Sequence, residues 1–178
     1  MFKKFYILFL TVLLTGCFAK KKTTYSKTKT ITVKSSKEKP TERITKKELA
    51  KNSKANQVIE TAMTFTGVRY KFGGQTKKGM DCSGLIFVAL SENDIAFPRV
   101  SYQMANQGKR IKIKEVQKGD LLFFKTSKRG KNINHVGLVV DVGNEVKFIH
   151  STTSRGVIVS SLREGYWNSA FVKAQRIL

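Results

Sequence analysis

Thiol and imidazole groups are scarce in this sequence: its 178 residues include two cysteines and two histidines. Cys82 opens an apolar pattern of helical spacing between residues 85 and 90, so we predict a helix that begins at Cys82 with Asp81 as its N-cap. The positive end of a helix dipole stabilises a thiolate, which predicts a lowered pKa for Cys82. The residues alone leave two interpretations open, a reactive nucleophile or a small buried hydrophobic side chain.

The two histidines lie at opposite ends of two neighbouring strand candidates. His135 opens the run His135–Val142, and His150 closes the run Val146–His150. If these strands pair as a hairpin across the intervening Gly-Asn turn, both imidazoles lie near the same edge of a sheet. We therefore predict a triad in which His135 takes the proton of Cys82 and His150 orients His135. Purely structural histidines are the alternative. One Cys and two His could also ligate zinc, but no short metal-ligand spacing occurs, so no metal is expected.

The elements around these residues are typical of an α+β domain. A helix is predicted from Ser53 to about Phe65, with Gly67 as its stop, and a shorter helical or turn segment from Ser101 to Gly108. The strand candidates are Asp120–Lys125, His135–Val142, Val146–His150, Val157–Ser160 and Phe171–Ile177. The turns between them favour an antiparallel meander that curls into a half-barrel.

The N-terminal part of the chain differs in composition from the rest. Residues 1–16 combine two lysines, an apolar run too short to span a bilayer and small residues before Cys17, the pattern of a secretory signal. The motif Leu14–Cys17 resembles the bacterial lipobox, which implies cleavage before Cys17 and lipid attachment to it. An ordinary signal peptide followed by a chance cysteine is the alternative. Residues 17–53 are rich in Lys, Thr and Ser, which predicts a disordered basic tether before a domain at residues 54–178.

The charge balance narrows the choice of partners. The chain has 34 basic and 12 acidic residues, a formal net charge of +22. Anionic lipid head groups and cell-wall polymers suit an exported chain of this charge, whereas nucleic acid is excluded because a lipid-anchored exported protein rarely meets it. Each cysteine has its own local explanation, so no disulfide is predicted.

Five segments resemble, in order and spacing, the NlpC family of papain-like bacterial cell-wall peptidases. They are Arg69–Gly74, Asp81–Gly84, Lys118–Phe124, His135–Leu138 and Phe148–Ser151. The resemblance covers about residues 54 to 178. It implies a papain-like fold and a cysteine endopeptidase, without cofactor, that cuts peptidoglycan stem peptides between γ-linked D-glutamate and a diamino acid. We expect a monomer in the bacterial cell envelope, anchored through Cys17 to the membrane (the outer membrane in a Gram-negative cell), with the domain facing the periplasm or wall.

The resemblance also implies roles for single residues. Its matching positions make Cys82 the nucleophile, His135 the base and His150 the orienting residue. Tyr70 matches a tyrosine whose hydroxyl lines the site and assists the oxyanion. Asp81 and Ser83 match positions that border the substrate groove and, in some relatives, help to bind the free amine of a stem. The backbone N–H of Cys82 is a further oxyanion donor.

Two departures from the family pattern concern the substrate. Arg69 stands where many relatives have proline, which changes the entry to the loop, and Met104 stands where glutamine is frequent, which predicts an altered first subsite. A catalytically silent wall-binding scaffold is the alternative function from another class. An amidase or acyltransferase on the same fold would share the triad.

Overall fold

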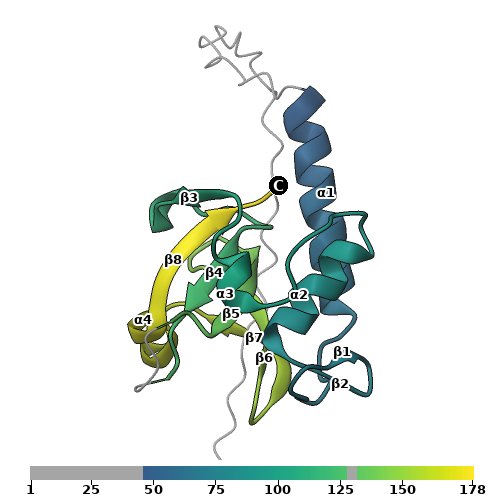
Figure 1. Cartoon of the computed structure of the whole chain (residues 1–178). Helices are drawn as coiled ribbons and strands as arrows, with labels where there is room; N and C mark the ends of the chain where they lie inside the picture. Colours follow the sequence, from purple (N-terminus) through teal and green to yellow (C-terminus); the bar gives the residue numbers. More distant parts are fainter. Residues whose placement is uncertain (1–45, 128–131) are drawn as a thin grey trace, which may run out of the picture. The chain divides into compact units, whose positions relative to one another are not determined.

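Two α-helices lie against one face of an antiparallel sheet (Figure 1). The computed structural model describes residues 46–127 and 132–178. Helix α1 spans Lys46–Met63 and α2 spans Cys82–Ser91, and both contribute fully buried side chains to a core shared with the sheet. The α+β architecture predicted from the sequence is confirmed. Across the described residues, no helix is long and apolar enough to cross a membrane.

Helix α1 begins earlier than predicted. The sequence placed its start at Ser53, whereas it starts at Lys46. The stretch at 46–52, KKELAKN, is rich in strong helix formers, which extend the helix beyond the apolar pattern used for the prediction. Residues 46–53 of the predicted tether therefore belong to α1. The predicted signal, Cys17 and the rest of the tether up to residue 45 lie outside the described residues.

Within the described residues, six antiparallel strands form the sheet in the order β3-β8-β4-β5-β6-β7. They are β3 (Lys109–Ile111), β4 (Leu121–Phe124), β5 (His135–Asp141), β6 (Lys147–Thr152), β7 (Gly156–Ser161) and β8 (Phe171–Arg176). The predicted meander is confirmed from β4 to β7 and is wrong for the last strand. A short helix, α4 (Gly165–Ala170), follows β7, and β8 then pairs between β3 and β4 instead of extending the sheet beyond β7.

Several further elements span four residues or fewer. They are β1 (Gln75–Thr76), β2 (Gly79–Met80), α3 (Ser101–Met104) and the 3-10 helix η1 (Ile113–Glu115). Strands β1 and β2 form a small hairpin within the glycine-containing loop before α2. Helix α3 confirms the predicted short helical segment.

Both faces of the sheet are buried. In β4, Leu121 and Phe123 pack into the core shared with α1 and α2, whereas Leu122 and Phe124 pack into a second core that includes residues of α4. Alternate residues of a strand point to opposite faces, so His135 of β5 lies on the α4 face. The start of β5 and the end of β6 therefore lie between the two cores, and the candidate site is built there.

Candidate active site

Cys82 is the first residue of α2, and Asp81 is its N-cap, as the sequence predicts. The Asp81 carboxylate accepts a hydrogen bond from the backbone N–H of Gly84 at 2.6 Å. Glycine is required at position 84 because a Cβ there would lie 2.1 Å from the carbonyl oxygen of Gly74. The loop and the first turn of α2 can thus approach each other closely, which fixes the thiol beside the loop.

The thiol of Cys82 is buried, with 8% of the residue exposed. Burial raises the pKa of Cys82 to about 11, and the negative charge of Asp81 adds to the rise. The backbone N–H groups of Val136, Ser83 and Cys82 itself act in the opposite direction. The predicted lowering of the pKa is therefore wrong, because desolvation of the thiolate outweighs the position at a helix N-terminus. Cys82 is a neutral thiol at neutral pH.

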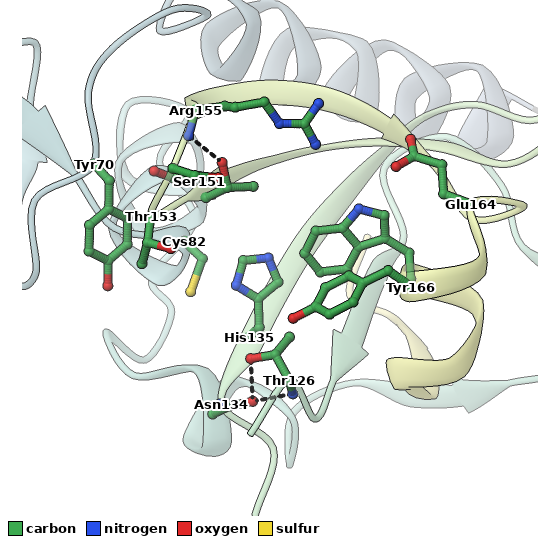
Figure 2. Close-up of a pocket in the computed structure, with 13 residues that line it drawn as sticks. Tyr70, Cys82, Thr126, Asn134, His135, Ser151, Thr153, Arg155, Glu164 and Tyr166 are labelled. Carbon is green, nitrogen blue, oxygen red and sulfur yellow. Dashed lines mark hydrogen bonds between the residues drawn. The ribbon is translucent and has the colours of Figure 1, made fainter. Parts of the chain in front are cut away.

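His135 and His150 converge as predicted. Strands β5 and β6 pair antiparallel, with Leu138 opposite Ile149, which brings the start of β5 to the end of β6. Nε2 of His135 lies 2.8 Å from Nδ1 of His150, a hydrogen-bond distance, and the rings are nearly perpendicular. This bond leaves Nδ1 of His135 for another partner. Figure 2 shows the His135 ring and the Cys82 thiol in one hollow.

Burial keeps both imidazoles neutral. It lowers the pKa of His135 to about 4. Burial also lowers the pKa of His150, and the charges of His135 and Arg155 lower it further. Nε2 of His150 is buried without a hydrogen-bond partner among the described residues, so nothing there offsets the cost of a positive charge.

The free energy of unfolding is expected to fall as the pH is lowered from 6.5 towards 4. An unfolded histidine binds a proton near pH 6.5, whereas folded His135 stays neutral down to about pH 4, so acid favours the unfolded state across this window. At ~1.4 kcal/mol per pKa unit, the shift corresponds to about 3 kcal/mol for His135 alone. Urea unfolding in steps between pH 7 and pH 4 measures the loss.

A double variant, His135→Gln with His150→Gln, is the control for this pH dependence. Its unfolding free energy should change less over the same window, because the groups that titrate late are gone. Carboxylates such as Asp81 remain in both proteins and cancel in the comparison. Equal slopes for the two proteins would show that the buried histidines are not the cause.

Arg99 joins Asp81 and Ser83 beside the thiol. Its guanidinium donates to both carboxylate oxygens of Asp81 at 3.0 Å and to Ser83 Oγ at 2.8 Å. The backbone N–H of Gly73 also donates to Asp81, at 2.8 Å. Burial alone would raise the pKa of Asp81, but the bonds from Arg99, Gly84 and Gly73 and the charge of Arg99 outweigh it and lower the pKa. Asp81 therefore ties the loop, the helix and Arg99 together.

Sequence reasoning gave Arg99 no role in this cluster. Its partner Asp81 is distant in the sequence, and no periodicity connects the two loops that carry them. Because Arg99 occupies both oxygens of Asp81, a ligand ammonium would have to compete with a guanidinium there. In this geometry the Asp81 carboxylate is engaged by Arg99 and by backbone N–H groups rather than free for a ligand.

Cys82 lies where two hollows meet. One, of about 460 Å³, is lined by residues of β5, the β6–β7 turn and α4, and the other, of about 400 Å³, by residues of the loop before α2 and the start of α3. Tyr70, Cys82 and Asn134 line both, while Asp81 and Ser83 line the second. Burial raises the pKa of Tyr70, and the charges of Cys82 and Asp81 add to the rise, so its hydroxyl keeps its proton.

Met104 does not line either hollow. Its side chain is fully buried in the core shared with α1 and α2. The prediction that Met104 alters the first subsite is therefore wrong, because the fourth residue of α3 faces inward. Arg99, Val100 and Ser101 border the smaller hollow instead.

Trp167 of α4 is a site residue that the sequence did not reveal. Its ring stacks on His135 with a centroid distance of 5.2 Å and an interplanar angle of 22°, and it meets His150 edge-on at 4.4 Å. The residue is 5% exposed and lines the larger hollow. The available signal was weak, since Trp167 is the chain's one tryptophan and stands in a short segment between two strand candidates.

In the parts of the chain that the structure describes, no three His, Cys, Asp or Glu side chains are grouped to hold a metal ion. His135 and His150 bond each other through Nε2 and Nδ1, so this pair of nitrogens is already engaged. The arrangement instead places a thiol, an imidazole and a second imidazole in sequence. That order suits nucleophilic attack with proton transfer.

Comparison with known proteins places the chain in a family. The model of the NlpC/P60 family matches residues 67–176, a span that holds the thiol, both histidines and Trp167. The chain belongs to the NlpC/P60 family. The family assignment confirms the resemblance seen in the sequence motifs.

Relatives of this NlpC/P60 domain carry the names of peptidases and hydrolases. The chain is 44% identical over 112 residues to "Probable endopeptidase NlpC" of Escherichia coli (strain K12), covering 62% of this chain and 70% of the relative. It is 36% identical over 124 residues to "Murein DD-endopeptidase MepS/Murein LD-carboxypeptidase" of the same organism, covering 69% and 63%. The chain thus spans just under two thirds of that relative.

Two further similarities are to a glutamyl hydrolase and to a solved structure. The "Gamma-DL-glutamyl hydrolase" of Bacillus subtilis (strain 168) is 34% identical over 138 residues, covering 75% of this chain and 33% of that protein. A crystal structure of an NlpC/P60 family protein from Bacillus cereus superimposes with a TM-score of 0.63 at 30% identity, covering 70% of this chain and 40% of that one. The α+β fold is therefore that of solved NlpC/P60 proteins.

Proposed function

We propose that this protein is a cysteine peptidase that hydrolyses stem peptides of peptidoglycan, at the bond between γ-linked D-glutamate and a diamino acid. The observation that carries the proposal is that Cys82, which lines both hollows, shares the larger one with His135, whose Nε2 lies 2.8 Å from Nδ1 of His150. The names of the E. coli and B. subtilis relatives support the substrate class and the γ-glutamyl bond. A silent scaffold would have no chemical use for the buried thiol and the buried imidazole pair.

The first half of the reaction forms a thioester. His135 accepts the thiol proton at Nδ1 while the sulfur of Cys82 bonds to the scissile carbonyl carbon, whose oxygen takes the negative charge. Because the pKa of Cys82 is about 11 and that of His135 about 4, this proton moves as the S–C bond forms rather than beforehand. The C–N bond then breaks, and His135 returns the proton to the leaving nitrogen.

The second half of the reaction releases the acid. His135 takes a proton from water as the water oxygen attacks the thioester carbon, and the C–S bond breaks when that proton returns to sulfur. His150 fixes the tautomer: if its Nδ1 accepts from Nε2–H of His135, Nδ1 of His135 carries the free lone pair that the mechanism needs.

Two donors suit the oxyanion. The backbone N–H of Cys82 lies at the start of α2, where helix N–H groups have no intrahelical partner, and the dipole favours negative charge there. The hydroxyl of Tyr70 lines both hollows next to Cys82 and stays protonated. A tetrahedral intermediate at Cys82 would therefore meet two donors that need no reorganisation.

Residues outside the described range complete the proposal. We include in it a lipid anchor at Cys17, a basic tether and a place in the bacterial envelope, because an exported and anchored domain would meet peptidoglycan and an anionic surface. A Cys17→Ser change should move the protein from the membrane fraction to the soluble fraction. Electrophoresis of the two fractions would test the anchor independently of the chemistry.

Digestion of purified peptidoglycan tests the proposed activity. We expect wild-type protein to release fragments whose new ends are a D-glutamate γ-carboxylate and a diamino acid amine, identified by mass spectrometry of the muropeptides. New D-alanine carboxyl ends would instead show a cut between stems and correct the bond. Stems released with a free N-terminal amine, from glycan that keeps its lactyl carboxylate, would indicate amidase activity. An absence of new ends with folded protein would favour the wall-binding scaffold.

A further inference from the structure

The proposed reaction places the leaving fragment in the larger hollow. Cys82 lines both hollows, whereas His135 lines the larger hollow and not the smaller one. In the proposed reaction the imidazole must return its proton to the leaving nitrogen, so the fragment that carries this nitrogen lies against His135. The acyl fragment then occupies the smaller hollow, beside Tyr70 and Ser83.

Two opposite charges line this leaving-fragment hollow, and the proposed mechanism uses neither. Arg155 lies in the β6–β7 turn, and Glu164 is the residue immediately before α4. Figure 2 shows the guanidinium of Arg155 extending across the hollow in the direction of Glu164. Within the described residues, the guanidinium has neither an ion-pair partner nor a hydrogen-bond partner. Its charge is nevertheless close enough to the site to lower the pKa of His150.

The backbone that carries Arg155 is firmly held. Its N–H donates to Thr152 Oγ1 at 3.0 Å, and Thr152 Oγ1 donates to the carbonyl of Gly156 at 3.3 Å. Gly156 has φ +67°, and a Cβ there would lie 2.2 Å from the carbonyl oxygen of Val68, so the turn is locked against the segment after α1. A rigid turn that presents an unpaired guanidinium is suited to bind an anion.

The carboxylate of Glu164 is also held in place, but it can still accept hydrogen bonds from a ligand. Its Oε1 accepts from the backbone N–H of Ser161 at 2.9 Å, which orients the carboxylate at the rim of the hollow. The described residues place no cation in an ion pair with it. A carboxylate of this kind accepts further hydrogen bonds and attracts an ammonium group.

The geometry points to a subsite in which Arg155 binds a free carboxylate of the leaving fragment and Glu164 attracts a free ammonium group of the same fragment. This inference rests on the proposed function and adds what selects the residue after the cut. A diamino acid whose side chain ends in both an amine and a carboxylate satisfies both charges. Lysine lacks the carboxylate, and an amidated side chain removes its charge.

Matched stem peptides test this subsite. Two peptides contain the γ-D-glutamyl bond to meso-diaminopimelate, one with the free side-chain carboxylate and one with that carboxylate amidated. We expect wild-type kcat/KM to be about 10- to 100-fold higher for the acid, the range for a charge-assisted hydrogen bond. Arg155→Gln should bring the acid-to-amide ratio close to one by losing activity on the acid, while activity on the amide stays within about threefold. Arg155→Lys should retain part of the preference because it keeps the charge but not the planar fork.

Glu164→Gln and a remote charge change complete the experiment. Glu164→Gln should lower the preference for a peptide with a free side-chain amine over its N-acetylated form and leave the acid-to-amide ratio in place. Arg163→Gln removes an exposed cation that lines neither hollow at the site and should change neither ratio. An unchanged acid-to-amide ratio in Arg155→Gln overturns the assignment of Arg155, and an unchanged amine preference in Glu164→Gln overturns that of Glu164.

A binding measurement separates failure of this inference from failure of the proposed function. Calorimetry with Cys82→Ala protein and the two peptides reports recognition without cleavage. Tighter binding of the acid, lost on adding Arg155→Gln, supports the subsite even if the wild type cuts another bond. Equal affinity for acid and amide overturns the subsite. If the wild type cleaves no stem peptide and binds neither, both proposals fall together.

Discussion

A Cys82→Ser variant is expected to keep the fold and to release muropeptides about 10⁴-fold more slowly than the wild type, or slower still. The change replaces the sulfur of a residue that is 8% exposed with an oxygen, so the packing around the first residue of α2 is preserved. A hydroxyl is a far weaker nucleophile than sulfur, and the buried environment that already opposes ionisation of the thiol opposes an alkoxide more strongly. Release of soluble fragments from purified peptidoglycan measures the rate, and thermal unfolding measures the fold.

Ser160→Ala is a matched control for this variant. Ser160 is another small buried polar residue, on β7, whose hydroxyl has no hydrogen-bond partner in the described residues and which lines neither hollow at the site. Its loss should leave the rate unchanged. A Cys82→Ser protein that keeps more than a tenth of the wild-type rate would place the nucleophile elsewhere, and the proposed mechanism would fail.

The parts of the site that the sequence predicts depend on interactions between residues close together in the chain. Asp81 and Cys82 precede an apolar helical pattern, which is enough to predict a helix start, its cap and the position of the thiol. His135 begins one strand candidate and His150 ends the next, and a short turn joins the two strands. Antiparallel pairing across this turn brings the strand ends that carry the histidines together. Both predictions depend on short-range periodicity and turn chemistry, where sequence signals are strongest.

The parts that the sequence misses depend on contacts between distant segments. Arg99 reaches Asp81 from another loop, and β8, which follows α4, inserts between β3 and β4. The pKa of Cys82 is the clearest case. The helix N-terminus is visible in the sequence, but the burial that outweighs it results from packing against β5, so the direction of the shift cannot be read from the motif.

A Trp167→Ala variant is expected to lower kcat about 10- to 100-fold and to move the acid limb of the kcat/KM profile to higher pH. The indole covers the His135–His150 pair by stacking on one ring and meeting the other edge-on. Removing it frees the imidazoles to rotate, and a misplaced base of this kind costs up to about 100-fold. It also admits water, so the pKa of His135 should rise from about 4 towards 6.5, and activity should be lost at a higher pH than in the wild type.

Two companion variants separate this positioning role from a loss of stability. Trp167→Phe keeps an aromatic face over His135 and should restore most of kcat and the wild-type acid limb. Phe171→Ala removes a ring that packs on Phe124 in the same core, at 6.1 Å between centroids, without a ring contact to either histidine in the described residues. It should lower the unfolding temperature and leave the pH profile in place when assayed below that temperature. If Phe171→Ala shifts the acid limb as much as Trp167→Ala, the shift reflects a loosened core, and Trp167 has no specific role in holding the histidine pair.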